Sequence, residues 1–288
     1  EEPGALDLAY ALAEECGAPY VLANDPDADR LALAARHPAS PNGYRQLNGN
    51  ELGLLLGQRA AEQELLTAAR EQRKPTGALA STLVSSPALG ALARHYGLAH
   101  AETLPGFKWV ARVPGLIFGY EESIGYLTTP AVVGDKDGVS AAAEALAMLR
   151  DLHAAGRTVW QELDALSERI GLYASAQIVV RRERMAEAET LAERIRAHPP
   201  TGFGGIAVTR ARDFRSPGLA PAPTNLLAYD LADGSRVMIR PSGTEPKLKI
   251  YLDAFSEAGS VAERRAQTSA ALAAIEAAAR DYLTGAEQ

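Results

Sequence analysis

Residues 236–252 read Arg-Val-Met-Ile-Arg-Pro-Ser-Gly-Thr-Glu-Pro-Lys-Leu-Lys-Ile-Tyr-Leu, two alternating apolar runs on either side of a loop rich in turn residues. Alternation of apolar and polar side chains is typical of a half-buried strand, so these runs predict two adjacent strands. A loop fixed at both ends by strands presents its polar groups in a defined direction. This stretch therefore predicts a strand–loop–strand unit in the last part of the chain.

The loop at residues 240–247 carries groups suited to a phosphate ester. Arg240 offers a planar fork of donors that matches two phosphate oxygens, and Ser242 and Thr244 add hydroxyl donors. Gly243 lets the backbone approach closely, so that successive amides can form an anion-binding nest. A plain hairpin turn is the alternative interpretation, because Pro, Ser and Gly are turn residues in any case.

Composition limits the classes of function. A chain of 288 residues with a formal charge of −7 is long enough for two or three domains and has no general electrostatic attraction for nucleic acid. Its single cysteine, Cys16, excludes an internal disulfide and favours a reducing compartment. No signal peptide and no apolar run of about 20 residues is present. We therefore expect a cytoplasmic protein without a nucleic-acid or membrane partner.

The first part of the chain, residues 1–72, reads as the remnant of an α/β unit. It begins without methionine and enters a helix at once, and the apolar face of that helix, which includes Leu8, Leu12 and Cys16, is expected to be buried. A strand, an acidic loop, a second strand and a helix follow. This pattern leads us to expect a fragment whose upstream strands are missing.

Two further parts follow a polar, turn-rich stretch at residues 71–77. In residues 73–170 strands alternate with helices, which predicts a mainly parallel sheet. Residues 171–288 contain several strands and two helices in an α+β pattern that favours an antiparallel sheet. The expected fold class is therefore α/β, with mixed α/β domains followed by a C-terminal α+β domain.

Three carboxylates directly follow the strand at residues 20–23. Asp25, Asp27 and Asp29 are two residues apart and have no cysteine or histidine close in sequence, a donor set that favours Mg²⁺ over zinc. A calcium-binding EF-hand is excluded, because Arg30 and Arg36 stand where its glycine and closing glutamate are required. Arg30 could neutralise a metal-bound phosphate. A solvated acidic turn is the alternative.

A second candidate loop, residues 119–126, reads Gly-Tyr-Glu-Glu-Ser-Ile-Gly-Tyr and follows a strand. The carboxylate of Glu121 and the hydroxyl of Ser123 would suit the vicinal hydroxyls of a sugar, although a surface turn is equally consistent with the pattern. Lys136 precedes a helix, where its charge opposes the helix dipole unless an anion binds or aspartates cap the helix. Lys108, beside aromatic residues, could meet a sugar phosphate or pack in a core.

Taken together and in this order, four segments resemble the α-D-phosphohexomutases, the phosphoglucomutase/phosphomannomutase family, over nearly the whole chain. Residues 25–30 are similar to the magnesium loop of that family, and residues 106–109 to the loop that discriminates sugar orientation. Residues 121–123 resemble its sugar-binding loop, and residues 240–246 its phosphate loop. The two sugar-contacting segments are closer to the branch that includes phosphoglucomutase 2 and phosphopentomutase-like members.

The resemblance implies a role for each candidate residue. Mg²⁺ would be held by Asp25, Asp27 and Asp29, and the catalytic residues of this chain would be Arg30 and Lys136. Substrate-binding residues would be Lys108, Glu121, Ser123, Arg240, Ser242, Gly243 and Thr244. The chain would supply the second half of domain 2 (residues 1–72), domain 3 (residues 73–170) and domain 4 (residues 171–288).

The same resemblance implies an isomerase of carbohydrate metabolism, an intramolecular phosphotransferase that interconverts hexose 1- and 6-phosphates. It would work through a phosphoserine and a bisphosphate intermediate, with glucose 1,6-bisphosphate as activator. The family's Thr-Ala-Ser-His-Asn-Pro-like serine motif has no match here, so we expect this chain to bind a phosphosugar without turnover unless the missing N-terminal domains join it. The alternatives are a non-catalytic sugar-phosphate-binding module and a metal-dependent sugar phosphatase. The preferred sugar, whether glucose, mannose, pentose or glucosamine, stays open.

Overall fold

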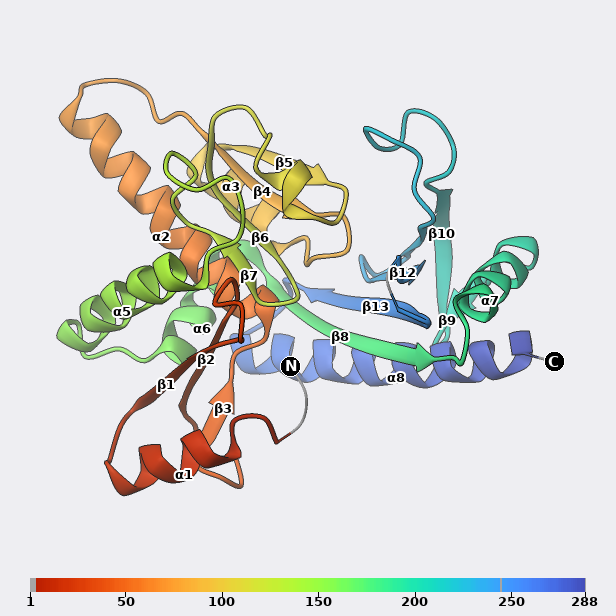
Figure 1. Cartoon of the computed structure of the whole chain (residues 1–288), viewed down its shortest axis with the longest axis horizontal. Coiled ribbons are helices and arrows are strands. Elements are labelled where there is room, and N and C mark those ends of the chain that lie inside the picture. The colour runs from red at the N-terminus through yellow and green to blue at the C-terminus, as the bar shows by residue number, and fades with distance from the viewer. Residues whose placement is uncertain (1–3, 244, 288) are drawn as a thin grey trace. The chain divides into compact units, whose positions relative to one another are not determined.

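The computed structural model describes residues 4–243 and 245–287, and the chain divides into two units, Glu1–Ala165 and Leu166–Gln288. Unit 1 has two sheets and unit 2 has one, and each unit has its own buried apolar residues (Figure 1). The expected class, mixed α/β units followed by an antiparallel α+β unit, is confirmed. The finer division into three parts at residues 72 and 170 stays a prediction. In residues 4–243 and 245–287 no helix combines the length and hydropathy needed to cross a bilayer.

Unit 1 begins with a small antiparallel sheet in the strand order β1-β2-β3. Its central strand is an uninterrupted apolar run, and five of its six residues are buried. The helix before it packs through Ala13, whereas Leu8 and Leu12 are 90% and 59% exposed and Cys16 is exposed as well. The expectation of a buried helix face is therefore wrong for these three residues. The elements are α1 (Asp7–Glu15), β1 (Tyr20–Asn24), β2 (Leu31–Arg36) and β3 (Tyr44–Gln46).

The second sheet of unit 1 has the order β5-β4-β6-β7. The first three strands are parallel and β7 turns back antiparallel to β6, so the mainly parallel sheet expected from the sequence is present. The loop that carries Glu121 to Ile124 joins β6 to β7. The elements are β4 (Ala78–Thr82), α3 (Ala88–Tyr96), β5 (Ala99–Thr103), α4 (Phe107–Val110), β6 (Leu116–Glu121) and β7 (Gly125–Leu127).

Three longer helices complete this unit: α2 (Gly49–Arg70), α5 (Gly138–Ala154) and α6 (Val159–Ile170), the last of which crosses into unit 2. α2 begins with a capping box, in which Asn48 and Glu51 satisfy each other's backbone amides. Its glycines allow close packing on the second sheet, because a Cβ on Gly53 would lie 2.5 Å from the ring of Tyr120. The start of α2 is thereby fixed beside the β6–β7 loop.

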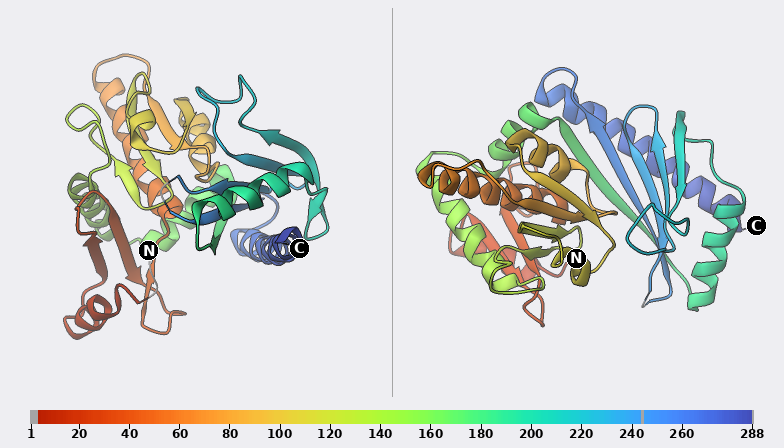
Figure 2. Two further views of the ribbon diagram at one scale, coloured as in Figure 1. Left: turned by 45° about the vertical axis from the view of Figure 1, so that its right-hand side comes forward. Right: turned by 90° about the horizontal axis from the view of Figure 1, so that it is seen from above.

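Unit 2 is a six-stranded antiparallel sheet in the order β8-β13-β12-β11-β10-β9. The alternating runs at residues 236–241 and 247–256 do pair as adjacent antiparallel strands, with Arg240 opposite Lys249. Figure 2 shows the sheet with its two helices from further sides. The elements are β8 (Leu172–Arg181), α7 (Met185–Ala197), β9 (Gly202–Phe203), β10 (Ile206–Asp213), β11 (Leu227–Leu231), β12 (Arg236–Pro241), β13 (Lys247–Ser256) and α8 (Val261–Glu287).

The two faces of this sheet differ in polarity, as strand alternation requires. One face buries apolar side chains such as Ile239 and Ile250 against α7 and α8. The alternate positions carry Arg240, Lys249 and the buried ion pair of Arg236 with Asp253, whose nitrogen and oxygen lie 2.7 Å apart. Polar groups near the 240–247 loop therefore lie on the face opposite the helices.

Candidate functional site

Three segments of unit 1 that are far apart in the sequence meet at the acidic turn. The amide of Leu31, directly after this turn, donates a hydrogen bond of 3.1 Å to the carbonyl of Ile124 in the β6–β7 loop. The amide of Gly138, at the start of α5, donates one of 3.1 Å to the carbonyl of Ala28 within the turn. The backbone therefore brings the predicted metal loop, the predicted sugar loop and the segment of Lys136 together.

Within the acidic turn, Arg30 lies between two of the carboxylates. Its amide donates to Asp25 Oδ1 at 3.2 Å, and its Nε lies 3.9 Å from Asp25 Oδ2 and 4.0 Å from Asp29 Oδ1. Ala28 adopts a φ of +57°, which turns the chain sharply between Asp27 and Asp29. The turn thus brings two of the three predicted metal ligands to the same arginine.

The donor set of this turn fits a hard cation, since carboxylate oxygens are the ligands that Mg²⁺ takes in proteins. In the part of the chain that the structure describes, however, no group of three or more His, Cys, Asp or Glu side chains is arranged to hold a metal ion. Asp25 and Asp29 instead face the cations of Arg30 and Lys136. Magnesium binding by Asp25, Asp27 and Asp29 stays a prediction.

Lys136 is held by this acidic turn. Its Nζ lies 2.7 Å from Asp29 Oδ2 and 6.0 Å from the ring centroid of Phe107. The following residue, Asp137, caps α5 by accepting hydrogen bonds from the amides of Val139 and Ser140. The aspartate cap that competed with anion binding in the sequence is therefore present, and the charge of Lys136 is balanced by Asp29.

Glu121 ends β6 with its carboxylate turned toward Gly106, whose amide donates to Oε1. Burial raises the pKa of this carboxyl above its ordinary value, and the neighbouring charge of Glu122 raises it further. The Gly106 amide and the charges of Lys136 and Arg30 act in the opposite direction on the same pKa. Glu121 is therefore a partly desolvated acceptor close to both cations of the acidic turn.

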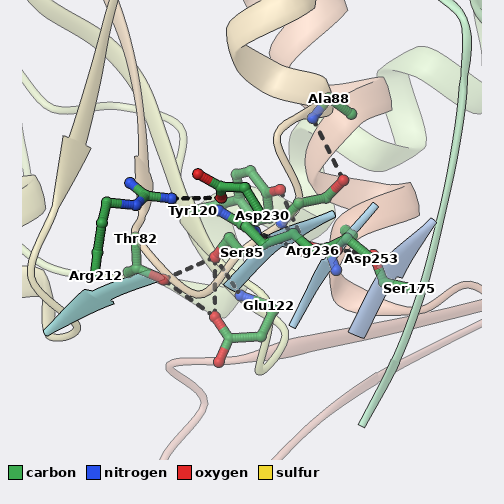
Figure 3. A network of polar contacts seen from close by, with 12 residues as sticks. Thr82, Ser85, Ala88, Tyr120, Glu122, Ser175, Arg212, Asp230, Arg236 and Asp253 are labelled. Carbon is green, nitrogen blue, oxygen red and sulfur yellow. Dashed lines mark hydrogen bonds and ion pairs between the residues drawn. The ribbon is translucent and has the colours of Figure 1, made fainter. Parts of the chain in front are cut away.

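Glu122 faces the other way, toward two buried hydroxyls that the sequence did not single out. Its Oε2 accepts hydrogen bonds from Ser85 Oγ at 2.9 Å and Thr82 Oγ1 at 3.2 Å (Figure 3). Ser123 follows on the same loop and is half-buried. No sequence signal connects Thr82 and Ser85 to this loop, because the contact joins residues about 40 positions apart.

The short helix α4 places its residues differently from one another. Phe107 is buried beside Lys136, whereas Lys108 is exposed and its Nζ lies 5.9 Å from the ring centroid of Trp109. Lys108 therefore does not pack in a core, which was the competing interpretation of its sequence context. Its contact with a ligand stays a prediction.

In unit 2 the predicted phosphate loop is a closed turn between β12 and β13. The amide of Ser242 donates to the carbonyl of Lys247 at 2.8 Å, and the amide of Glu245 donates to Ser242 Oγ at 3.3 Å. Gly243 is exposed, and a Cβ there would meet nothing within 4 Å. Thr244, predicted as a phosphate ligand, lies outside the described residues.

Cations gather around this loop. Lys249 is opposite Arg240 in the sheet, and Lys247 is opposite Arg181. A hydrogen bond from Lys247 lowers the pKa of the exposed Glu245 carboxyl, and the charges of Lys247, Lys249 and Arg181 add to this effect. Arg181 was not among the predicted site residues, because its position depends on cross-strand pairing over more than 60 residues.

The candidate residues therefore fall into two groups, one in each unit. In unit 1 the structure brings together Asp25, Asp29, Arg30, Glu121 and Lys136. In unit 2 Arg240, Ser242 and Gly243 lie on or next to one turn.

Comparison with known proteins points in one direction. The model of phosphoglucomutase/phosphomannomutase alpha/beta/alpha domain III matches residues 48–170, and that of the C-terminal domain of the same family matches residues 178–271. A probable phosphomannomutase of Haemophilus influenzae is 41% identical over 254 residues, which cover 88% of this chain and 50% of that protein. Human phosphopentomutase is 33% identical over 288 residues, with 90% and 46% covered.

The fold agrees with these matches. A phosphoglucomutase/phosphomannomutase family protein of Burkholderia thailandensis superimposes with a TM-score of 0.65 at 17% identity, over 99% of this chain and 51% of that one. The chain spans about half the length of the relatives it matches. The family resemblance of the four segments is thereby confirmed, and the chain belongs to the phosphoglucomutase/phosphomannomutase family.

Proposed function

We propose that this chain is the substrate-binding part of a sugar-phosphate mutase that interconverts hexose 1-phosphates and 6-phosphates. The observation that carries the proposal is the meeting of the acidic turn, the β6–β7 loop and Lys136 in unit 1. Carboxylates, a lysine and an arginine at one place suit a ligand that has both hydroxyls and a charged phosphoryl group. The relatives named phosphomannomutase and phosphopentomutase support the same reaction class.

Glu121 and Ser123 are proposed to hold the sugar. An ionised carboxylate accepts hydrogen bonds from two neighbouring hydroxyls, and a serine hydroxyl can donate or accept one. Burial of Glu121 strengthens such hydrogen bonds, because their electrostatic attraction is larger in surroundings of low dielectric constant than in water. Lys108 would add an exposed positive charge next to this loop.

Asp25, Asp27 and Asp29 are proposed to hold Mg²⁺, which when bound would stabilise negative charge on the transferred phosphoryl group. Arg30 can offer its guanidinium to the oxygens of the same group. Lys136, oriented by Asp29, presents its ammonium from the start of α5. These cations would favour the phosphoryl group at the position where the turn and the sugar loop meet.

The loop in unit 2 is proposed to hold the phosphate that is not being transferred. Arg240, Ser242, Gly243 and Thr244 supply side-chain and backbone donors, and Lys247 and Lys249 add positive charge. Since the donors come from a turn closed by strand pairing, little ordering is needed when the phosphate binds.

In the proposed reaction, a phosphoserine outside this chain passes its phosphoryl group to the free hydroxyl of a sugar monophosphate. The bisphosphate formed then returns its other phosphate to the serine, and glucose 1,6-bisphosphate would serve as activator. The 288 residues contain no match to the family's serine motif, so we expect binding without turnover from this chain. The N-terminal domains would be its partner, residues 1–72, 73–170 and 171–288 its three domain parts, and the cytoplasm its location.

The same missing motif favours a second candidate, a sugar-phosphate-binding module without catalysis. A titration of the chain with glucose 1-phosphate and with inorganic phosphate, followed by amide NMR, tests the shared claim. We expect the sugar phosphate to bind more tightly than phosphate, with Glu121→Ala removing the difference and Arg240→Ala weakening both. Equal affinities for the two ligands in the unsubstituted chain would contradict a sugar site.

A further inference from the structure

The loop that carries Glu121 and Ser123 is fastened from behind by a buried hydroxyl pair. Thr82 ends β4 and Ser85 lies just after it, with 0% and 1% of each residue exposed. Their hydroxyl oxygens lie 2.8 Å apart, and both hydroxyls reach the carboxylate of Glu122 (Figure 3). The amide of Glu122 in turn donates to Ser85 Oγ at 3.2 Å. Ser85 therefore bonds both the side chain and the backbone of the central loop residue.

The start of α2 closes the same loop from another side. A Cβ on Gly49 would lie 1.9 Å from the carbonyl oxygen of Glu122, so the helix backbone is almost in direct contact with the loop. Asn50 Oδ1 accepts hydrogen bonds from the hydroxyl of Tyr120 at 3.0 Å and the amide of Ser86 at 2.9 Å. One asparagine thus joins the end of β6 to the segment that carries Ser85.

The backbone of the loop has an unusual conformation at Ile124. Ile124 has a φ of +55°, a left-handed conformation that a β-branched residue adopts only under constraint. Such a conformation persists where the surroundings over-determine it, and it concentrates at ligand-binding loops. The hydrogen bonds of Glu122 and the packing of Gly49 supply that constraint.

We propose that Thr82, Ser85 and Glu122 are positioning residues, which set the directions of the Glu121 carboxylate and the Ser123 hydroxyl through the loop backbone. This inference rests on the proposed sugar site. The side chain of Glu122 points to the hydroxyl pair and that of Glu121 points to Gly106, so neighbouring residues face opposite ways. Holding the Glu122 carboxylate in place therefore also sets the direction of the Glu121 carboxylate, because the two residues share the loop backbone. Two neutral donors satisfy Glu122 without adding a cation that would compete for Glu121.

The test compares two ligands that use the loop differently. Amide NMR titrations of the whole chain give the Kd for glucose 1-phosphate, whose hydroxyls would contact Glu121, and for inorganic phosphate, which has no sugar hydroxyls. Ser85→Ala and Thr82→Val each remove a hydrogen bond to a charged group. We expect each substitution to weaken the affinity for glucose 1-phosphate by about tenfold and to leave the affinity for inorganic phosphate unchanged.

Two further variants separate positioning from a general loss of structure. Thr82→Ser keeps the hydroxyl and should restore the affinity for glucose 1-phosphate. Thr103→Val is the matched control: Thr103 is the cross-strand neighbour of Thr82 on β5, is 6% exposed, and bonds only the carbonyl of Leu104 among the contacts described for its side chain. We expect its sugar-phosphate affinity to equal that of the unsubstituted chain.

Each other outcome counts against the inference. If Ser85→Ala and Thr82→Val bind glucose 1-phosphate normally, the positioning role is wrong while the sugar site stands. If these variants lose affinity for both ligands equally, or if Thr103→Val loses as much affinity for glucose 1-phosphate, the two hydroxyls contribute only to the general stability of the fold. If the unsubstituted chain does not prefer glucose 1-phosphate to inorganic phosphate, the proposed sugar site and this inference fail together.

Discussion

Glu121 illustrates at the scale of one residue how a binding group can oppose stability. Its carboxylate is desolvated and has a second carboxylate beside it, so its pKa is raised although an amide and two cations favour the ionised form. When a carboxyl has a higher pKa in the folded than in the unfolded state, its ionisation lowers the stability of the folded protein. A residue that binds substrate hydroxyls is expected to carry such a cost.

The first prediction follows from this sign. Between the ordinary pKa of a glutamate and the raised pKa of Glu121, the folded chain holds a proton that the unfolded chain has released, so stability falls as the pH rises through this window. Glu121→Gln removes this ionisation, so the variant should be more stable than the unsubstituted chain at neutral pH. Denaturant unfolding at several pH values measures the difference, and Asp7→Asn, at an exposed position of α1, is the control. If the gain in the free energy of unfolding of Glu121→Gln were the same below and above this pH range, this account would be contradicted.

The second prediction concerns His100 on β5, whose Nε2 lies 3.1 Å from Ser81 Oγ. Burial, with a smaller effect from the charge of Arg94, lowers the pKa of His100 to about 4. As the pH falls, the unfolded chain therefore binds the proton before the folded chain does. The contribution of neutral His100 to the free energy of unfolding is complete above about pH 6.5 and is lost as the pH falls toward 4. We expect a loss on the order of 2 kcal/mol, discounted for partial exposure. His100→Gln should flatten this part of the pH profile, while exposed His153→Gln should not.

At the scale of elements, the glycine that opens α5 determines how closely the acidic turn can approach. A Cβ on Gly138 would lie 2.3 Å from the carbonyl oxygen of Arg30 and 2.8 Å from that of Ala28. These are backbone atoms, which cannot move aside as a flexible side chain could. The glycine thus keeps Lys136 next to Asp29.

The third prediction uses this contact. Gly138→Ala should lower the free energy of unfolding by about 1–3 kcal/mol, a typical cost of overpacking, and should weaken glucose 1-phosphate binding because Lys136 moves. Gly134→Ala, where a Cβ meets nothing within 4 Å, is the matched control and should change neither quantity. Chemical denaturation and the NMR titration report the two effects. Unchanged stability in Gly138→Ala would show that α5 can shift freely.

Some elements and contacts could be predicted from the sequence and others could not, for physical reasons. Alternation at residues 236–252 predicted the β12–β13 pair because strand periodicity is a local property. The exposed Leu8 and Leu12 were mispredicted, because an apolar helix face shows what could be buried and not what lies nearby. The contacts of Thr82 and Ser85 with Glu122 had no local signal in the sequence. They depend on the parallel pairing of β4 with β6, and α3, β5 and α4 lie between these two strands in the sequence.

Considered as a whole molecule, the chain has two candidate binding parts, one in each unit. The candidate sugar loop and acidic turn belong to unit 1, and the candidate phosphate loop belongs to unit 2. Each part can therefore be removed by substitution within one unit, Glu121→Ala or Arg240→Ala. The chain spans about half the length of its relatives. The central claim, proposed above, is that it binds a sugar phosphate without turning it over.

Phosphorus NMR of the chain with glucose 1-phosphate, Mg²⁺ and a trace of glucose 1,6-bisphosphate tests this central claim most directly. We expect the substrate resonance to broaden or shift without formation of product, and Arg240→Ala to abolish the effect. Appearance of the glucose 6-phosphate resonance would contradict the claim, because it would require a nucleophile within these 288 residues. Release of inorganic phosphate would contradict it in favour of a phosphatase, and an unperturbed substrate resonance would show that the chain does not bind the sugar phosphate.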